Sequence, residues 1–82
     1  AVARDGTVYV CTNVTNTVVR IPAAGGETAT VAGEEKAMTV AGSTACVFSE
    51  DERALYVATA GANAIPLDGK TEPAKVVEVR LD

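Results

Sequence analysis

The sequence contains no histidine and no tryptophan, and its aromatic residues are one phenylalanine and two tyrosines. Without histidine, the chain cannot build the Ser–His or Cys–His pairs that activate many hydrolytic nucleophiles. Paired carboxylates could do acid–base chemistry, but all acidic residues except Glu27 and Glu78 fall in expected turns and loops or at the C-terminus. The sequence therefore predicts no complete catalytic constellation, and catalytic residues stay unassigned.

The sequence also has little positive charge and no long apolar run. Seven lysines and arginines, standing singly, face eleven aspartates and glutamates, which gives a net charge of −4. This pattern argues against binding to nucleic acid or to an anionic membrane. No run approaches the roughly 20 apolar residues that span a bilayer. A signal peptide and an initial Met are missing, as in a mature secreted chain, a proteolytic fragment or an incomplete sequence.

Cysteine is scarce, with only Cys11 and Cys46 in the chain. Their spacing matches no zinc or redox motif. Both lie in apolar, strand-like runs, where a free cysteine behaves as a small buried hydrophobic residue. Two buried free thiols and a single disulfide are alternatives that the sequence leaves open.

The chain is rich in valine, alanine and threonine. With 82 residues, 48% of them hydrophobic and 22% charged, it is apolar enough to be globular but too short for a large core. Branched residues favour strands, and Gly and Pro mark turns. The expected strands are Thr7–Thr12, Thr17–Ile21, Thr28–Ala32, Thr44–Phe48, Ala54–Thr59 and Lys75–Leu81.

An internal repeat organises these strands. Residues 5–12 resemble residues 51–59, and Tyr9 matches Tyr56, 47 positions later. Residues 18–21 resemble residues 76–79 at an offset of 58, so the second copy carries eleven extra residues near 61–74. Short strands that repeat every 40 to 50 residues or so are typical of propeller blades.

Apolar residues occupy both sides of the expected strands. Val8 and Val10 lie on one side of the first strand, and Tyr9 and Cys11 lie on the other. A sheet with one wet face would alternate apolar and polar residues, so this pattern favours a sheet packed between two others. The alternative is a single small β-sandwich.

We therefore expect an all-β fold, a β-propeller fragment of about two blades with four-stranded antiparallel sheets. Residues 1–42 form the first blade, with a truncated opening strand, and residues 43–82 form the second, without its last strand. Uncovered blades expose apolar faces and strand edges, which need cover. The remainder of a longer propeller chain or further copies of this chain would supply it, and the truncated opening strand favours the longer chain.

The segment Gly42-Ser-Thr-Ala-Cys-Val-Phe-Ser-Glu-Asp-Glu-Arg-Ala-Leu-Tyr-Val-Ala-Thr59 resembles a known pattern. The pattern is Asn-Gly-Leu-Ala-Phe-Ser-Pro-Asp-Gly-Lys-x-Leu-Tyr-Val-x-Asp of the SMP-30/gluconolactonase/LRE-like six-bladed propellers. The run at 13–21 and the insertion at 64–71 are most similar to secreted, fungal-type members. The resemblance implies an extracellular C-terminal section of a propeller.

The resemblance also implies that a small organic molecule binds at the central axis. Its chemistry would be that of a lactone hydrolase or of a metal-free cyclase. The alternatives are a non-catalytic binding or scaffold propeller, and a fragment without independent activity.

Family lactonases hold a divalent cation with Glu, Asn and Asp. The resemblance places Thr44 at the Asn position, and Thr59 and, in the first repeat, Thr12 at the Asp position. A neutral hydroxyl is a poor ligand for a hard dication, so we expect no metal site from this segment. A divalent cation would need ligands from residues outside it. The resemblance implies that these threonines, with Asn13, line a pocket. The alternative is that they are ordinary strand-end threonines.

Asn13-Val14-Thr15 is also a glycosylation sequon, which makes Asn13 a candidate glycosylation site in a secreted protein. The alternative is a turn in which the asparagine caps its own backbone, and Asn16 would serve the same turn. The charged segments 34–36 and 49–53 read as solvated loops, since neither has the ligand spacing of a calcium loop.

Overall fold

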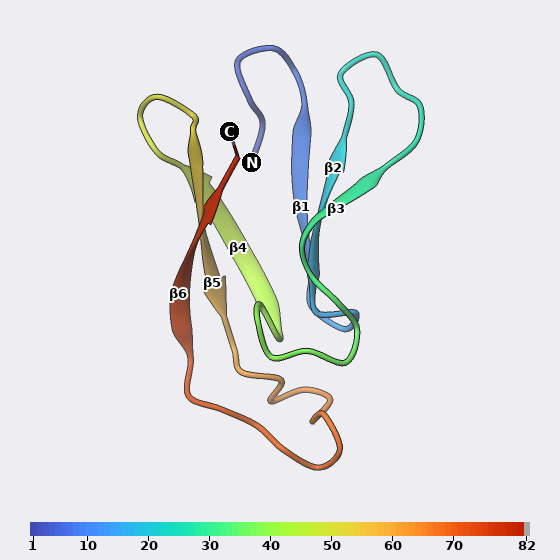
Figure 1. Ribbon diagram of the computed structural model, residues 1–82, viewed down its shortest axis with the longest axis vertical. Coiled ribbons are helices and arrows are strands. Elements are labelled where there is room, and N and C mark those ends of the chain that lie inside the picture. Colours follow the sequence, from blue (N-terminus) through green and yellow to red (C-terminus); the bar gives the residue numbers. More distant parts are fainter. Residues whose placement is uncertain (82) are drawn as a thin grey trace.

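A computed structural model describes residues 1–81 of the chain. No helix occurs in this range, which confirms the predicted all-β class. The strands, shown in Figure 1, are β1 (Val8–Thr12), β2 (Thr17–Ile21), β3 (Ala29–Gly33), β4 (Ser43–Phe48), β5 (Ala54–Thr59) and β6 (Lys75–Arg80). Each of the six expected strands is present, and its ends differ from the prediction by at most one residue.

The strands form two separate three-stranded antiparallel sheets, in the orders β1-β2-β3 and β4-β5-β6. Residues 1–3 run beside β1, where Tyr9 N donates to Ala1 O at 2.8 Å, and Val2 forms an isolated bridge opposite Val8. The sheets therefore have the six predicted strands, three in each, and the four-stranded blades expected of a complete propeller are not formed within residues 1–81. The bridge beside β1 stands where the truncated opening strand was expected.

The two sheets are built alike. β1 lies between residues 1–3 and β2, as β5 lies between β4 and β6. In the turn before β1, Thr7 N donates to Asp5 Oδ1 at 2.8 Å, and in the turn before β5, Arg53 N donates to Asp51 Oδ1 at 3.0 Å. The residue between donor and acceptor is left-handed in both turns, with φ of 92° and 61°. The sequence repeat is thus also a repeat of local structure.

The core lies between the two sheets. It consists of Tyr9 and Val18 from the first sheet, Leu55 and Val57 from the second, and Val40 from the connection between them. Branched and aromatic side chains from facing strands fill this layer because each strand presents every second residue to it. The sheets meet mainly through β1 and β4.

Apolar residues also point away from this core. Val10 in the first sheet, and Val47, Tyr56 and Val76 in the second, are exposed. The expectation that the strands carry apolar residues on both sides is therefore confirmed. One side of each sheet covers the core, and the other side faces solvent.

Two sets of contacts join the sheets at opposite ends. At the upper end in Figure 1, the turn before β1 meets the turn before β5, since Arg4 N donates to both carboxylate oxygens of Glu52 at 3.2 Å. Arg4 Nη2 also donates to Glu50 O at 2.9 Å. The lower end gathers the connections 13–16, 34–42 and 60–74. We call this lower end the loop end.

Candidate functional site

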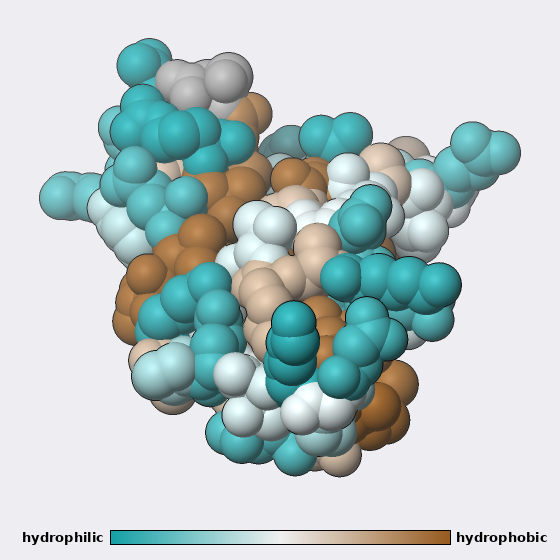
Figure 2. All heavy atoms as spheres, turned by 60° about the horizontal axis from the view of Figure 1, so that its bottom comes forward, coloured by the Kyte–Doolittle hydropathy of each residue, from teal (hydrophilic) through white to brown (hydrophobic). Residues whose placement is uncertain are grey.

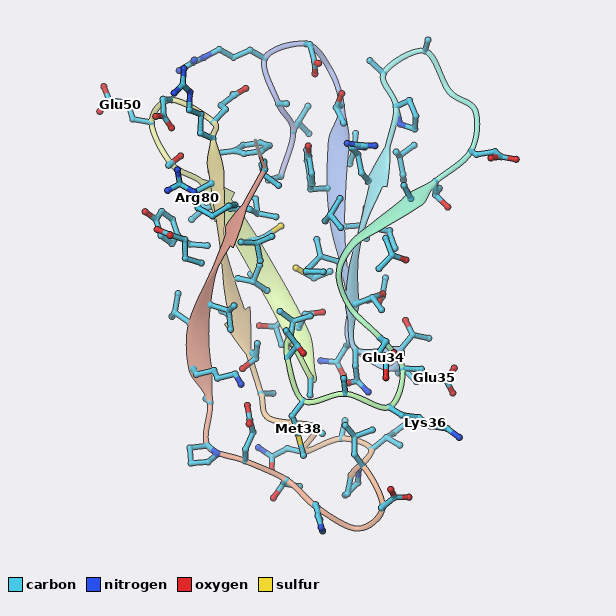
Figure 3. All side chains as sticks on the ribbon, viewed as in Figure 1. Glu34, Glu35, Lys36, Met38, Glu50 and Arg80 are labelled. Atoms are coloured by element: carbon cyan, nitrogen blue, oxygen red, sulfur yellow. The ribbon has the colours of Figure 1, made fainter. Side chains whose placement is uncertain are left out.

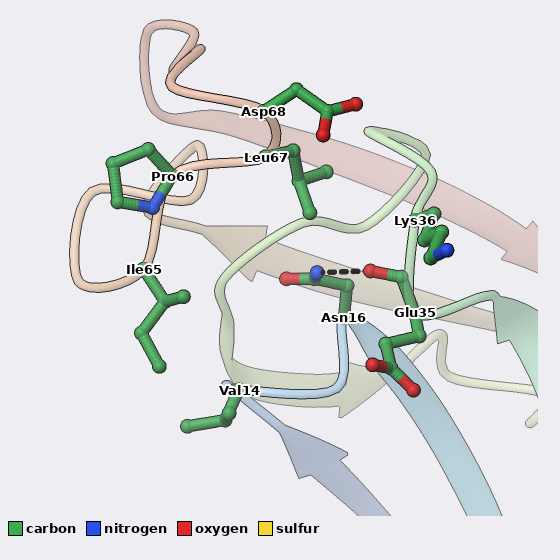
Figure 4. Close-up of a pocket in the computed structure, with 8 residues that line it drawn as sticks. All are labelled: Val14, Asn16, Glu35, Lys36, Ile65, Pro66, Leu67 and Asp68. Atoms are coloured by element: carbon green, nitrogen blue, oxygen red, sulfur yellow. Dashed lines mark hydrogen bonds between the residues drawn. The ribbon is translucent and has the colours of Figure 1, made fainter.

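The loop end is organised by Asn16, which ends the β1–β2 turn. Its backbone is left-handed with φ of 60°, a conformation that asparagine tolerates better than most residues. Its side chain is buried, with Nδ2 donating to Glu35 O at 2.7 Å and Oδ1 accepting from Gly42 N at 2.9 Å. One amide thus fixes both ends of the 34–42 connection, which carries the chain from the first sheet to the second. Figure 4 shows its bond to Glu35 O.

Two further side chains attach the same turn to the start of β4. Ser43 Oγ donates to Thr17 O at 2.9 Å, and Asn13 Nδ2 donates to Gly42 O at 3.4 Å. Buried polar groups usually have such partners, because an unpaired one is costly. The loop end is therefore held by polar side chains, whereas the middle of the molecule is held by apolar ones.

The insertion 60–74 closes the other side of the loop end. Gly61 is left-handed with φ of 67°, and a Cβ there would overlap the backbone carbonyl of Glu72. Glycine permits this close approach, in which Glu72 N donates to Gly61 O at 3.0 Å. Lys75 Nζ lies 2.7 Å from Glu72 Oε2 and donates to Met38 O at 3.3 Å. The insertion is thus tied to the 34–42 connection.

A cavity of about 260 Å³ lies between the insertion, the 34–42 connection and the β1–β2 turn. Figure 4 shows the residues that line it, namely Val14, Asn16, Glu35, Lys36, Ile65, Pro66, Leu67 and Asp68. The turn contributes Val14 and Asn16, the insertion contributes three apolar residues and Asp68, and the connection contributes Glu35 and Lys36. In Figure 3, Glu34, Glu35 and Lys36 lie together at this edge of the loop end.

The chemistry of the cavity suits a small molecule with an apolar body and polar substituents. Val14, Ile65 and Leu67 offer apolar contact, and Glu35, Lys36 and Asp68 offer one cation and two carboxylates. The Asn16 amide is already bonded at both of its ends, so it supports the cavity and does not reach for a ligand. Four of the eight lining residues are apolar and four are polar or charged, so the walls are more polar than those of most small-molecule sites.

Two of the four predicted pocket residues use their hydroxyls within the sheets. Thr12 Oγ1 donates to Thr17 O at 3.0 Å and accepts from Thr17 N at 3.2 Å. At the matching repeat position, Thr59 Oγ1 donates to Lys75 O and accepts from Lys75 N, both at 3.3 Å. Each threonine therefore joins the end of its own strand to the start of the next.

The other two predicted residues also lie at the loop end. Thr44 is exposed and lines a groove between β1 and β4, with Oγ1 donating to Ala58 O at 3.3 Å. Asn13 is half-buried and bonded to Gly42 O, as described above. None of the four predicted residues lines the 260 Å³ cavity. Their role in a pocket, and glycosylation of Asn13, stay predictions.

The residues 1–81 contain no group of three or more His, Cys, Asp or Glu that could hold a metal ion. Thr12, Thr44 and Thr59, the three threonines discussed above as cation positions, are neutral, and the hydroxyls of Thr12 and Thr59 are bonded to backbone. These residues therefore do not fit a hard divalent cation, which needs several anionic or carbonyl oxygens.

The two thiols lie together in the groove between β1 and β4. Both are free and half-buried. Burial raises the pKa of the Cys11 thiol to about 11, and a hydrogen bond with Cys46 adds to this effect. Cys46 Sγ donates to Tyr9 O at 3.7 Å. A thiol with so high a pKa stays protonated at neutral pH, so Cys11 is a weak nucleophile.

Sequence reasoning missed the residues that line the cavity. Segment 34–36 is exposed, as the sequence predicts for a solvated loop, but nothing in it indicates that Glu35 and Lys36 line a cavity. The one available signal was the insertion itself, because eleven extra residues at the end of a short strand must cover some part of the molecule. Its position over the 34–42 connection depends on Gly61 and Lys75, which carry no recognisable motif.

Comparison with models of protein families, with curated proteins and with solved structures finds no match. In the described part of the chain, no helix is long and apolar enough to cross a membrane. A proposal for function therefore rests on the fold and on the loop end.

Proposed function

We propose that this chain is a section of a β-propeller, about two blades long, of the SMP-30/gluconolactonase type. The observation that supports this most strongly is the structural repeat. Two antiparallel sheets with the same turn before the matching strands β1 and β5 face each other across one apolar layer. Stacked repeats of this kind bury a continuous core that a single repeat cannot bury.

The path of the chain between the sheets supports the same proposal. The chain leaves the first sheet from its outer strand, β3, and enters the second sheet at β4. Across the core, β4 contacts β1. This outer-to-inner crossing repeats from blade to blade in a propeller. Asn16 and Ser43 hold the crossing in place from the β1–β2 turn.

We propose further that the loop end binds a small organic molecule. The mixed apolar and charged lining of the 260 Å³ cavity supports this role. Of the two chemistries that the family resemblance implies, the metal-free one agrees better with this segment, because its threonines do not suit a dication. A non-catalytic binding role is the second candidate, favoured by the backbone bonds that occupy the Thr12 and Thr59 hydroxyls.

The test is an NMR titration of the isotope-labelled chain with three probes. These are glucono-1,5-lactone, gluconate and an aliphatic δ-lactone of similar size. Binding should shift amide signals of residues 13–16, 34–42 and 60–74, and Asp68→Asn or Ile65→Ala should weaken it. Glu27→Gln, in the exposed β2–β3 turn, is the matched control that should change nothing.

The same samples separate the candidate roles. Acid release from either lactone, faster than in buffer, supports a hydrolase, and saturable shifts without acid release support a binding role. Shifts that are missing for all three probes at millimolar concentration, or that spread over the strands, would contradict a ligand site at the loop end.

A further inference from the structure

The outer side of the second sheet is an exposed apolar surface. Its exposed members are Val47, Tyr56 and Val76, at 62%, 38% and 70% exposure. Together with Ala45 and Ala58 they line a shallow depression of about 210 Å³. We call these five residues the tail face. Figure 2 shows apolar surface along its left flank, the side on which β6 lies in Figure 1.

The outer side of the first sheet is apolar as well. Val10 pairs with Val19 and Val8 pairs with Ile21, so these four side chains share one side of the sheet. Val2, beside them in residues 1–3, is 66% exposed, and Val10 is 37% exposed. We call these five residues the head face. The two faces lie on opposite sides of the two-sheet molecule.

The repeat relates the tail face to a surface that is already covered. Tyr56 matches Tyr9, and Val76 matches Val18. Tyr9 and Val18 are buried against the second sheet, at 9% and 0% exposure. Tyr56 and Val76 of the tail face therefore occupy the repeat positions of Tyr9 and Val18, which pack in the core between the sheets.

The head face has the reciprocal relationship. Val8 and Val10 match Leu55 and Val57, which are fully buried against the first sheet. With one residue gapped in the turn, Val2 matches Phe48, whose ring packs against Tyr9. Val2, Val8 and Val10 of the head face therefore occupy the repeat positions of residues that pack in the core from the second sheet.

We propose that the chain associates head to tail with a second copy of itself, the head face of one copy covering the tail face of the next. This inference rests on the proposed propeller section and specifies which surfaces join. The proposed contact between two copies has the same kind of packing as the buried contact between the two sheets of one copy. The interface between copies would therefore extend the stacking that is already present inside each copy. A head-to-tail interface is heterologous, and it generates a closed ring when the rotation between copies permits closure.

The charged residues beside the faces are compatible with this contact. Glu78 lies on the same side of the second sheet as Tyr56, its register partner. It matches Arg20, the register partner of Tyr9 in the first sheet. Arg20 is exposed although the Tyr9 side of its sheet is covered. By the same register, Glu78 stays at the rim of the proposed interface and is not buried by it.

The test uses one charged substitution on each face. Val76→Glu places a carboxylate on the tail face, and Val10→Glu places one on the head face. Either should weaken association by about 100-fold or more, because burial of an unpaired carboxylate is costly. Thr71→Glu is the matched control, at an exposed residue of the insertion outside both faces and outside the cavity lining. If Val10→Glu fails to fold, the more exposed Val2→Glu replaces it.

Molar mass is then measured by light scattering for each variant and for a 1:1 mixture. The natural chain and Thr71→Glu should show multiples of 8.3 kDa that rise with concentration. Val76→Glu alone and Val10→Glu alone should each remain single copies. Their mixture should form a pair of chains and stop there, because each variant keeps one intact face of the opposite kind.

Three outcomes would overturn the proposal. They are a natural chain that stays monomeric at every concentration, a mixture that stays monomeric although the natural chain associates, and a single variant that still forms pairs. No residue lining the loop-end cavity belongs to either face. A failure here is therefore distinguishable from a failure of the ligand titration.

Discussion

The ring of Tyr9 meets the ring of Phe48 edge to face, with 5.3 Å between centroids and 89° between planes. Tyr9 belongs to β1 and Phe48 to β4, so this pair joins the two sheets across the core. Aromatic pairs of this geometry contribute beyond the area that they bury. Tyr56, at the position that matches Tyr9, is the remaining aromatic residue and lies exposed on the tail face.

Phe48→Ala should lower the free energy of unfolding by about 2 to 4 kcal/mol, since it removes a half-buried ring from a small core. Phe48→Leu keeps most of the volume and should cost less than about 1.5 kcal/mol. Urea unfolding at one fixed protein concentration measures both. A loss for Phe48→Ala no larger than that for Phe48→Leu would contradict the role given to the aromatic contact.

Asn16→Ala should destabilise the chain by about 2 to 4 kcal/mol, because it strands Gly42 N and Glu35 O and places alanine at a positive φ. Asn16→Gly is the informative partner, since glycine accepts the backbone conformation and loses only the two side-chain bonds. We expect Asn16→Gly to fall between alanine and the natural residue. Faster amide hydrogen exchange at Gly42 should accompany both changes. Unchanged exchange would contradict the hydrogen bond between Gly42 N and the Asn16 side chain.

The repeat and the two-sided apolar pattern were readable in the sequence because both depend on local spacing. Residues two apart on a strand share a side, so Val8 with Val10 and Tyr9 with Cys11 predict a strand that is apolar on both sides. The strand ends followed from turn residues such as Pro22 and Gly6. These features require no knowledge of which segments meet in space.

The loop end could not be predicted in this way, because its contacts join segments far apart in the sequence. Asn16 was expected to serve its own turn, and its amide instead bonds to Glu35 O and Gly42 N. The cavity forms only because the insertion folds over the 34–42 connection at Gly61. Glu35 and Asp68 are exposed, and nothing in the sequence around them indicates that they line one cavity.

Gly61→Ala should be much more destabilising than Gly25→Ala. Both glycines have positive φ, 67° and 82°, so the backbone strain is comparable. A Cβ at Gly61 overlaps the Glu72 carbonyl, whereas one at Gly25 meets nothing within 4 Å. We expect about 1 kcal/mol for Gly25→Ala and at least about 2 kcal/mol more for Gly61→Ala. Thermal unfolding of the two variants side by side provides the comparison, and equal losses would contradict the packing of the insertion.

Cys11 should resist alkylation until the pH is well above neutral. Burial raises the pKa of its thiol to about 11, above the ordinary value for cysteine. The folded state thus keeps a proton that the unfolded state releases as the pH rises toward 11, so stability should fall with rising pH across that interval. Peptide-resolved iodoacetamide labelling between pH 7 and about 11 measures the reactivity. A Cys11 labelling rate that levels off near pH 8 would contradict the burial of the thiol.

The central claim is that the two sheets are successive repeats of one stacked structure and that their outer faces need cover. The most direct measurement is the molar mass of the natural chain by light scattering over a wide concentration range. This claim predicts folded species whose molar mass is two or more times 8.3 kDa. A cooperatively folded single copy of 8.3 kDa at every concentration, with both outer faces in water, would contradict it.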